Sequence, residues 1–259
     1  MASSQIRGVK IAALRAVFFD FDNTLHDYSG AYARAFESAA APMCTGASGS
    51  PDPTELRRRC EEPWRHTWQR FMARQIDDAR LWTERSAAVV AAAGIPPNPH
   101  LAAAFHRAFV ATMEREIRLF GDVEPCLQVL EALQPRLLLG VLTNGPWAIQ
   151  QARIRHLGLE ARCPVIVISG ALGCSKPASA FFREALRRAG AAPPEAVMIG
   201  DNPETDIAGA KAAGLAAIFL DRVGAGWSRS WGPEPDAVAS DLRAATAWVV
   251  ARVETGTER

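Results

Sequence analysis

Short, uninterrupted apolar runs recur along the chain, and they constrain its fold more than any other feature of the sequence. A strand that helices cover on both faces has no polar side, so it forms a continuous apolar run rather than an alternating one. Segments with helical spacing of apolar residues lie between the later runs, and this alternation predicts an α/β fold with a doubly wound parallel sheet. The runs are residues 16–19, 137–142, 165–168, 197–199 and 216–220, and the helical segments are 148–156, 178–189 and 207–213.

The interval between the first and second runs differs from the rest, because it contains no convincing strand. Within it, residues 101–117 carry an apolar residue at every fourth position, which gives a helix one apolar face. Residues 45–53 are rich in Gly, Ser and Pro and predict a loop. We therefore expect a helical domain, residues 28–120, inserted into a core domain of residues 1–27 and 121–259.

The composition argues against nucleic-acid and membrane partners. Lys and Arg total 29 against 28 Asp and Glu, whereas a nucleic-acid-binding domain usually has a strongly basic face or tail. No stretch of about 18 apolar residues occurs, so no membrane span is expected, and the N-terminal residues lack the pattern of a signal peptide. The five cysteines show no metal-ligand spacing, which predicts free thiols in a reducing cytoplasm.

Two carboxylates follow the first predicted strand, in the segment D-F-D-N-T. Asp20 and Asp22 would lie at the carboxyl end of a buried strand, which is where ligands bind in open α/β sheets. Close like charges are unfavourable unless a proton or a cation offsets them, and a divalent metal is the obvious offset. A carboxylate can also act as a nucleophile. Asp, Asn and Thr equally favour turns, so a capped turn is the alternative interpretation.

Polar residues also follow the later predicted strands. Thr143 and Asn144 supply a hydroxyl and an amide that suit an oxyanion, although T-N-G is also a good turn. Lys176 precedes a helix, where a cation opposes the helix dipole unless an anion such as phosphate accompanies it; a surface lysine is the common alternative. Asp201 and Asp206 form another acidic pair, and Asp206 is expected to cap the helix that follows it.

These four ordered motifs, each at a predicted strand end, resemble those of the haloacid dehalogenase (HAD) superfamily of hydrolases. They are D-x-D-x-T, T-N, K-P and G-D-x-x-x-x-D, and the similarity spans about residues 14–222. The segments F-D-N-T-L, L-T-N-G and G-D-N-x-x-T-D-I look most like the motifs of one branch of this superfamily. That branch contains N-acylneuraminate-9-phosphatases and pyrimidine 5′-nucleotidases. The resemblance implies a Rossmann-like core, a C1-type helical cap in the insertion, and Mg²⁺-dependent hydrolysis of a small phosphate ester.

The resemblance also implies a role for each motif residue. Asp20 would attack phosphorus and become an aspartyl phosphate. Asp22 would protonate the leaving alcohol and then deprotonate the water that hydrolyses this intermediate. Thr143 and the backbone amide of Asn144 would hold phosphate oxygens, while Lys176 would neutralise charge on the nucleophile and on the transferring group.

A metal site follows from the same resemblance. Asp20, Asp201 and the backbone carbonyl of Asp22 would ligate Mg²⁺, and Asp206 would ligate through water or orient Lys176. An all-oxygen site with a few carboxylates is the kind that Mg²⁺ prefers. The dehalogenases that name the superfamily have no acid two residues after the nucleophile, so Asp22 favours phosphate-ester chemistry over C–Cl or C–P cleavage.

Four further residues are candidate substrate contacts. Arg65 and His66 lie in an aromatic and basic segment of the insertion, residues 64–74, which could recognise the leaving group. Aromatic residues at helical spacing more often pack, so packing is the preferred interpretation of that segment. His26 follows the nucleophile loop, and Trp147 lies three residues after the T-N motif.

Two other functions fit the same motifs. A phosphomutase would use the same scaffold, and release of inorganic phosphate without a bisphosphate activator would separate a hydrolase from it. A non-catalytic HAD-like binding module is expected to lack a motif residue, and none is lost here. The motifs carry no information about the alcohol, so the substrate stays open among sugar phosphates, sialic-acid-type phosphates, nucleoside monophosphates and a specialised-metabolite phosphate.

Overall fold

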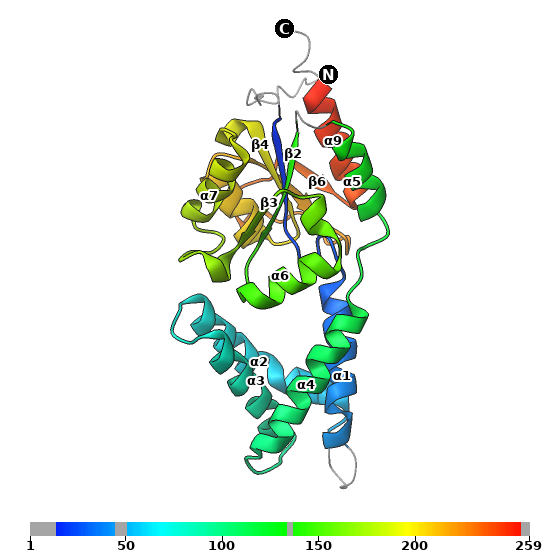
Figure 1. The fold of residues 1–259 in the computed structure, drawn as a ribbon, viewed down its shortest axis with the longest axis vertical. Coiled ribbons are helices and arrows are strands. Elements are labelled where there is room, and N and C mark those ends of the chain that lie inside the picture. The colour runs from blue at the N-terminus through cyan, green and yellow to red at the C-terminus, as the bar shows by residue number, and fades with distance from the viewer. Residues whose placement is uncertain (1–13, 45–50, 134–136, 255–259) are drawn as a thin grey trace. The chain divides into compact units, whose positions relative to one another are not determined.

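The computed structural model shows two compact units, which we call the core unit and the helical unit (Figure 1). The core unit comprises Met1–Leu25 and Leu119–Arg259, and the helical unit comprises His26–Arg118. The residues that the structure describes are 14–44, 51–133 and 137–254. Part of the expected loop at 45–53, residues 45–50, therefore lies outside the described residues.

The core unit is built on a sheet of six strands, and every pair of neighbouring strands is parallel. The strand order is β3-β2-β1-β4-β5-β6, so the chain leaves β1 toward one edge and later returns to its other side. This confirms the predicted doubly wound α/β fold. The strands are β1 Ala16–Phe19, β2 Leu138–Thr143, β3 Val165–Ile168, β4 Ala196–Gly200, β5 Ala216–Leu220 and β6 Ala237–Ala239.

The five predicted runs form the first five strands, with boundaries that differ by one residue at most. The sixth strand was not predicted, because it has only three residues and Val238 at its centre is half exposed. An edge strand of this kind has no continuous apolar run to reveal it.

Helices cover both faces of the sheet, as its apolar strands require (Figure 1). Val17 and Phe19 of β1 belong to one apolar cluster, which includes residues of α5 and α9, whereas Ala16 and Phe18 belong to a second cluster with α7. Successive strand residues thus point to opposite buried faces. The helices are α5 Val123–Glu131, α6 Trp147–His156, α7 Ser179–Ala189, α8 Gly209–Ala212 and α9 Leu242–Glu254.

The helical unit has its own core. Phe105, Phe109 and Met113 of α4 are buried there, which confirms the apolar face that their four-residue spacing predicts. Trp64 of α2 is buried against Phe105 and Phe109, so this aromatic residue packs, as expected. The helices of the unit are α1 Tyr28–Ala40, α2 Pro53–Met72, α3 Asp78–Ala92 and α4 Pro99–Glu116.

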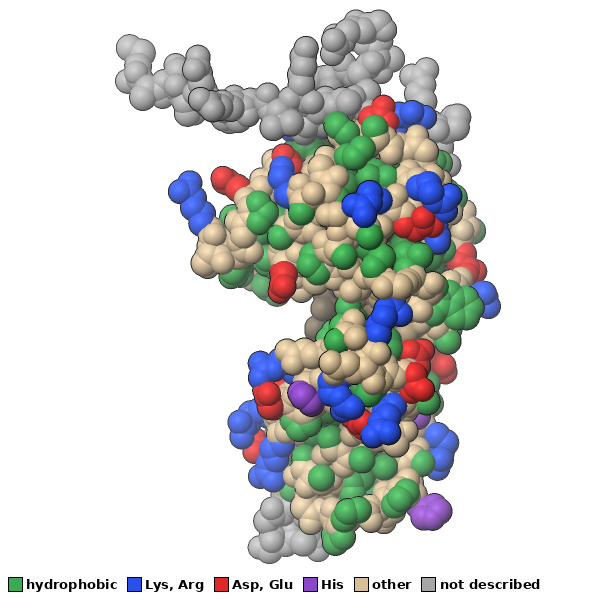
Figure 2. Space-filling view, turned by 90° about the vertical axis from the view of Figure 1, so that its left-hand side faces the viewer, with side chains coloured by type: hydrophobic (Ala, Val, Ile, Leu, Met, Phe, Trp, Pro, Cys, Tyr) green, Lys and Arg blue, Asp and Glu red, His purple; other side chains and the backbone are tan. Residues whose placement is uncertain are grey.

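The molecular surface carries mixed charge. On the face drawn in Figure 2, basic and acidic side chains are interspersed over both units. All five cysteines are free thiols, as expected, and three of them are buried. None of the helices in the described ranges is long and apolar enough to cross a membrane.

The packing around β2 predicts a destabilising substitution. A Cβ added at Gly140 would lie 2.9 Å from Cδ1 of Phe18 and 2.9 Å from the backbone oxygen of Val165, on the two neighbouring strands. Gly140→Ala should therefore lower the free energy of unfolding by about 1–3 kcal/mol, as overpacking in a core does. Gly173→Ala is the matched control, because nothing lies within 4 Å of its added Cβ. Equal urea midpoints for the two variants would contradict the prediction.

Candidate active site

The predicted catalytic residues lie at the carboxyl ends of adjacent strands. Asp20 follows β1 and Asp201 follows β4, and the backbone N–H of Asp20 donates to the oxygen of Ile199 at 2.9 Å. These two strands flank the point where the strand order reverses, which is where open α/β sheets bind ligands. The fold itself therefore brings together acids from distant parts of the sequence.

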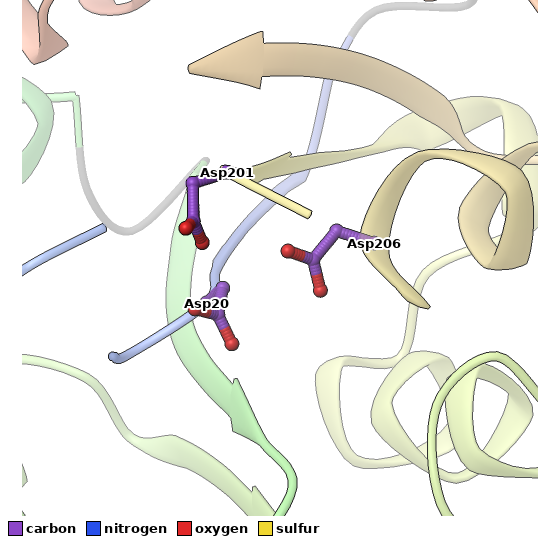
Figure 3. Close-up of side chains that lie close together, drawn as sticks. All are labelled: Asp20, Asp201 and Asp206. Carbon is purple, nitrogen blue, oxygen red and sulfur yellow. The ribbon is translucent and has the colours of Figure 1, made fainter. Parts of the chain in front are cut away.

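Three carboxylates converge at this switch point. Asp20, Asp201 and Asp206 each offer an oxygen, and these oxygens all lie within 4.8 Å of one another (Figure 3). Asp20 is 8% exposed and Asp206 is fully buried. Among the described residues, the third acid of this group is Asp206, and Asp22 contributes no side-chain oxygen to it.

One cation lies between two of these acids. The Nζ of Lys176 donates to Asp20 Oδ1 at 2.5 Å and to Asp206 Oδ1 at 2.6 Å, and the lysine side chain is 2% exposed. Burial by itself would lower the pKa of Lys176, but the charges of Asp20 and Asp206 outweigh it and raise that pKa. Lys176 is therefore a buried ammonium, not the exposed surface lysine of the alternative interpretation.

The cluster still has surplus negative charge. Burial raises the pKa of Asp20, although Lys176 opposes that rise. Burial, followed by repulsion from Asp206, raises the pKa of Asp201 to about 6. Three carboxylates, two of them buried and one partly buried, against one ammonium favour binding of either a proton or a further cation. Asp201 also accepts a hydrogen bond of 3.3 Å from the hydroxyl of Thr24, the last residue of the D-x-D-x-T motif.

The side chain of Asn144 positions the lysine. Its Nδ2 donates to the backbone oxygen of Lys176 at 2.9 Å, and its Oδ1 accepts from the Lys176 backbone N–H at 3.0 Å. Asn144 follows β2, so this pair of bonds fixes the K-P segment to the end of the sheet. The sequence predicts that Asn144 binds an oxyanion, but it does not reveal this contact with Lys176.

Gln150 is a candidate functional residue that the sequence motifs do not reveal. Its Nε2 lies 3.0 Å from Asp22 Oδ2 and 2.8 Å from Thr143 Oγ1, so one buried amide links two motifs. Gln150 lies in the first turn of α6, directly after the T-N-G segment. A polar residue at a buried helical position next to a motif is the signal that could have identified it.

The segment around Asp206 differs from the predicted helix at 207–213. A π-helical turn, Pro203–Ala208, precedes the short helix α8, and Asn202 caps it by accepting from the backbone N–H groups of Glu204 and Thr205. The prediction that Asp206 caps a helix is therefore wrong. Asp206 lies inside the turn, where its Oδ2 accepts a 3.1 Å hydrogen bond from the Asn202 N–H and its Oδ1 faces Lys176.

The comparisons with known proteins identify the family. Residues 14–214 match the haloacid dehalogenase-like hydrolase family. The chain belongs to this family. It is 35% identical over 185 residues to phosphoserine phosphatase of Thermus thermophilus, covering 68% of the chain and 70% of that relative. It is 30% identical over 230 residues to N-acylneuraminate-9-phosphatase of Rattus norvegicus, covering 83% and 85%.

A solved structure supports the same fold. The HAD hydrolase YfnB from Bacillus subtilis, whose structure was determined bound to magnesium, superposes with a TM-score of 0.70 at 19% identity. The match covers 91% of this chain and 98% of YfnB, and at this identity it supports the fold alone. Family membership and the phosphatase relatives together indicate that this HAD hydrolase is a phosphatase.

The four candidate substrate contacts differ in their exposure to solvent. His26 is fully buried and packs edge-on against Tyr28, with ring centroids 6.1 Å apart. Trp147 is 50% exposed at the start of α6. Arg65 is exposed and pairs with Glu62, while His66 is exposed on the same helix. His26 is therefore inaccessible to solvent, whereas the other three side chains are accessible.

Loss of the Gln150 amide should impair turnover without unfolding the protein. Gln150→Leu keeps a buried side chain of similar length but removes the donor to Asp22 and Thr143, so kcat for an alkyl phosphate should fall about tenfold or more. Gln151→Leu is the matched control, because the adjacent glutamine bonds Glu160 instead. The measurement is steady-state kinetics together with circular dichroism. Equal kcat for both variants would exclude a positioning role.

Proposed function

We propose that this HAD hydrolase is an Mg²⁺-dependent phosphomonoesterase that acts on a small phosphorylated metabolite through an aspartyl phosphate at Asp20. The observation that carries the proposal is the buried carboxylate of Asp20 at the switch point of the sheet, bonded to Lys176 and next to two further acids. A carboxylate in this position can attack phosphorus, and phosphoryl transfer depends mainly on positioning and on neutralising charge.

The residues of the cluster fit a magnesium ion. Their donors are all carboxylate oxygens, and burial, followed by repulsion from Asp206, raises the pKa of Asp201. Asp20 and Asp201 would hold the metal with the backbone carbonyl of Asp22, while Asp206 would orient Lys176. When bound, Mg²⁺ would supply charge neutralisation for the transferring phosphoryl group.

The other motif residues would transfer protons, stabilise charge and bind the phosphoryl oxygens. Asp22 would protonate the leaving alcohol and then accept a proton from the hydrolytic water, and Gln150 would hold its carboxylate in place. Lys176 would stabilise charge on the phosphoryl oxygens. Thr143 and the backbone N–H of Asn144 would bind those oxygens, since both lie at the end of β2.

The helical domain, residues 28–120, would act as a C1-type cap that selects the alcohol. The core motifs determine only the phosphoryl chemistry, so the residues that select the substrate must lie outside these motifs. Arg65, His66 and Trp147 are accessible and would be among the residues that contact the leaving group. The relatives named above act on different phosphate esters, and their names fit a small-metabolite substrate without selecting one. The free thiols fit a reducing cytoplasm.

The proposed nucleophile can be tested directly. Asp20→Asn keeps the shape of the side chain but removes its charge, so release of inorganic phosphate from a panel of phosphate esters should be abolished while the fold is retained. In the native protein, phosphate should be released without any bisphosphate activator. A requirement for a bisphosphate, with an isomerised product, would indicate a phosphomutase. Binding of esters without turnover would indicate a non-catalytic module.

Asp22→Asn should show a dependence on the leaving group. A general acid contributes about 10²–10⁴-fold when the leaving alkoxide is basic, and much less for p-nitrophenolate, which needs little protonation. The variant should therefore lose more kcat on an alkyl phosphate than on p-nitrophenyl phosphate. Asp20→Asn is the matched comparison, because it should lose both activities equally. Equal losses for Asp22→Asn would show that it acts through the metal site.

Metal binding should depend on pH. A proton on Asp201 competes with the metal, so Mg²⁺ affinity should be highest above the pKa of about 6 and fall as the pH is lowered through it. Each pH unit below that pKa should weaken binding by up to about tenfold for one competing proton. The measurement is a calorimetric Mg²⁺ titration of the full chain at several pH values. Affinity that does not change between pH 5 and 7, or full activity in excess chelator, would overturn this prediction.

A further inference from the structure

The helical unit contains a buried cation with no acidic partner. Arg85 lies in α3 and is 9% exposed, and it forms no ion pair with any residue that the structure describes. Within the described part of the chain, its guanidinium forms one hydrogen bond, from Nη2 to the backbone oxygen of Trp64 at 3.1 Å. Arginine is rarely buried without a carboxylate, because removing its charge from water is unfavourable. Arg85 therefore needs an explanation that packing alone does not supply.

Aromatic rings surround the guanidinium. Its Cζ lies 4.9 Å from the ring centroid of Trp64, 5.5 Å from that of Trp68 and 5.7 Å from that of Trp82. These contacts stabilise the cation through the ring faces and hold its plane in a fixed orientation. They do not use its N–H groups, so most of its hydrogen-bonding capacity stays available.

Two donors in this cluster are buried and find no acceptor in the described ranges of the chain. They are Nε of Arg85 and the indole Nε1 of Trp82, which neighbour one another through the cation–π contact. Burying a donor without an acceptor forfeits the free energy of its hydrogen bonds to water. Native proteins therefore almost always give such groups a partner. An anion bound beside the guanidinium would supply acceptors and charge together.

We propose that Arg85 and the surrounding Trp64, Trp68 and Trp82 form a binding site for a small organic carboxylate. A guanidinium presents N–H groups in a planar fork that matches the two oxygens of a carboxylate. Desolvating a carboxylate monoanion between aromatic rings is also easier than desolvating a phosphate dianion. The carboxylate would come either from the leaving group of the substrate or from a separate small molecule; the first case rests on the proposed phosphatase function.

Binding of glycolate to the full-length protein tests the site. Glycolate should change tryptophan fluorescence saturably, whereas glycolamide, which has the same shape without the charge, should not. Arg85→Met keeps an unbranched apolar side chain but removes the guanidinium, so glycolate affinity should fall about 10- to 100-fold. Arg80→Met is the matched control, because that arginine is exposed on the same helix and pairs with Glu84. Its affinity should equal that of the native protein.

Arg85→Lys provides a second test if Arg85→Met does not fold. It keeps the charge but not the planar fork, so glycolate should bind more weakly than to the native protein. Equal responses of the native protein to glycolate and glycolamide, or native affinity in either Arg85 variant, would overturn the proposal. Because fluorescence needs no turnover, this result stands even if the phosphatase function fails its own test.

Kinetics then separates the two sources of the carboxylate. If it belongs to the leaving group, glycolate should compete with 2-phosphoglycolate. In that case Arg85→Met should also lower kcat/KM for that ester more than for p-nitrophenyl phosphate. If it belongs to a separate molecule, glycolate should change the rate non-competitively, and Arg85→Met should alter both substrates equally.

Discussion

The active site depends on the buried ammonium of Lys176, which lies between Asp20 and Asp206. A buried charge is stable only when it is paired and hydrogen-bonded. Lys176 meets that requirement for both carboxylates, and they meet it for the lysine. Without the lysine, three carboxylates within 4.8 Å would repel one another and favour protonation. The lysine thus allows the acids to lie close together, and their remaining negative charge is the basis on which we propose a divalent cation there.

The sequence predicts this arrangement because the parallel sheet turns sequence order into spatial proximity. Each apolar run from Ala16–Phe19 onward is continuous, which is the pattern of a strand buried on both faces, and polar residues follow directly. Parallel strands end at one edge, so Asp20, Asp201 and the T-N motif had to gather there once the strands were recognised. Side-chain geometry is not needed to predict that these residues gather at one edge. The structure confirms the parallel sheet on which that prediction rests.

The contacts that the sequence did not reveal are those set by tertiary packing. Gln150 is one polar residue in an ordinary helix, and only the packing of α6 beside β2 shows that it reaches Asp22. The π-helical turn that carries Asp206 has no distinct residue pattern, and its Asn202-Pro203 start also suits an α-helix. The edge strand at Ala237–Ala239 is short and half exposed. In each case the local sequence allows several structures, and long-range contacts select one.

Lys176 and Arg85 are two buried cations among the described residues, and they differ in their partners. Lys176 has two carboxylate partners, Asp20 and Asp206. Arg85 has three aromatic neighbours but no carboxylate among the described residues, so its charge is held in place without being neutralised. The ring contacts recover part of the free energy that such a group loses on burial, and a bound anion would recover more of it. A site of this kind binds an anion because its own polar groups lack partners, and it discriminates against neutral analogues for the same reason.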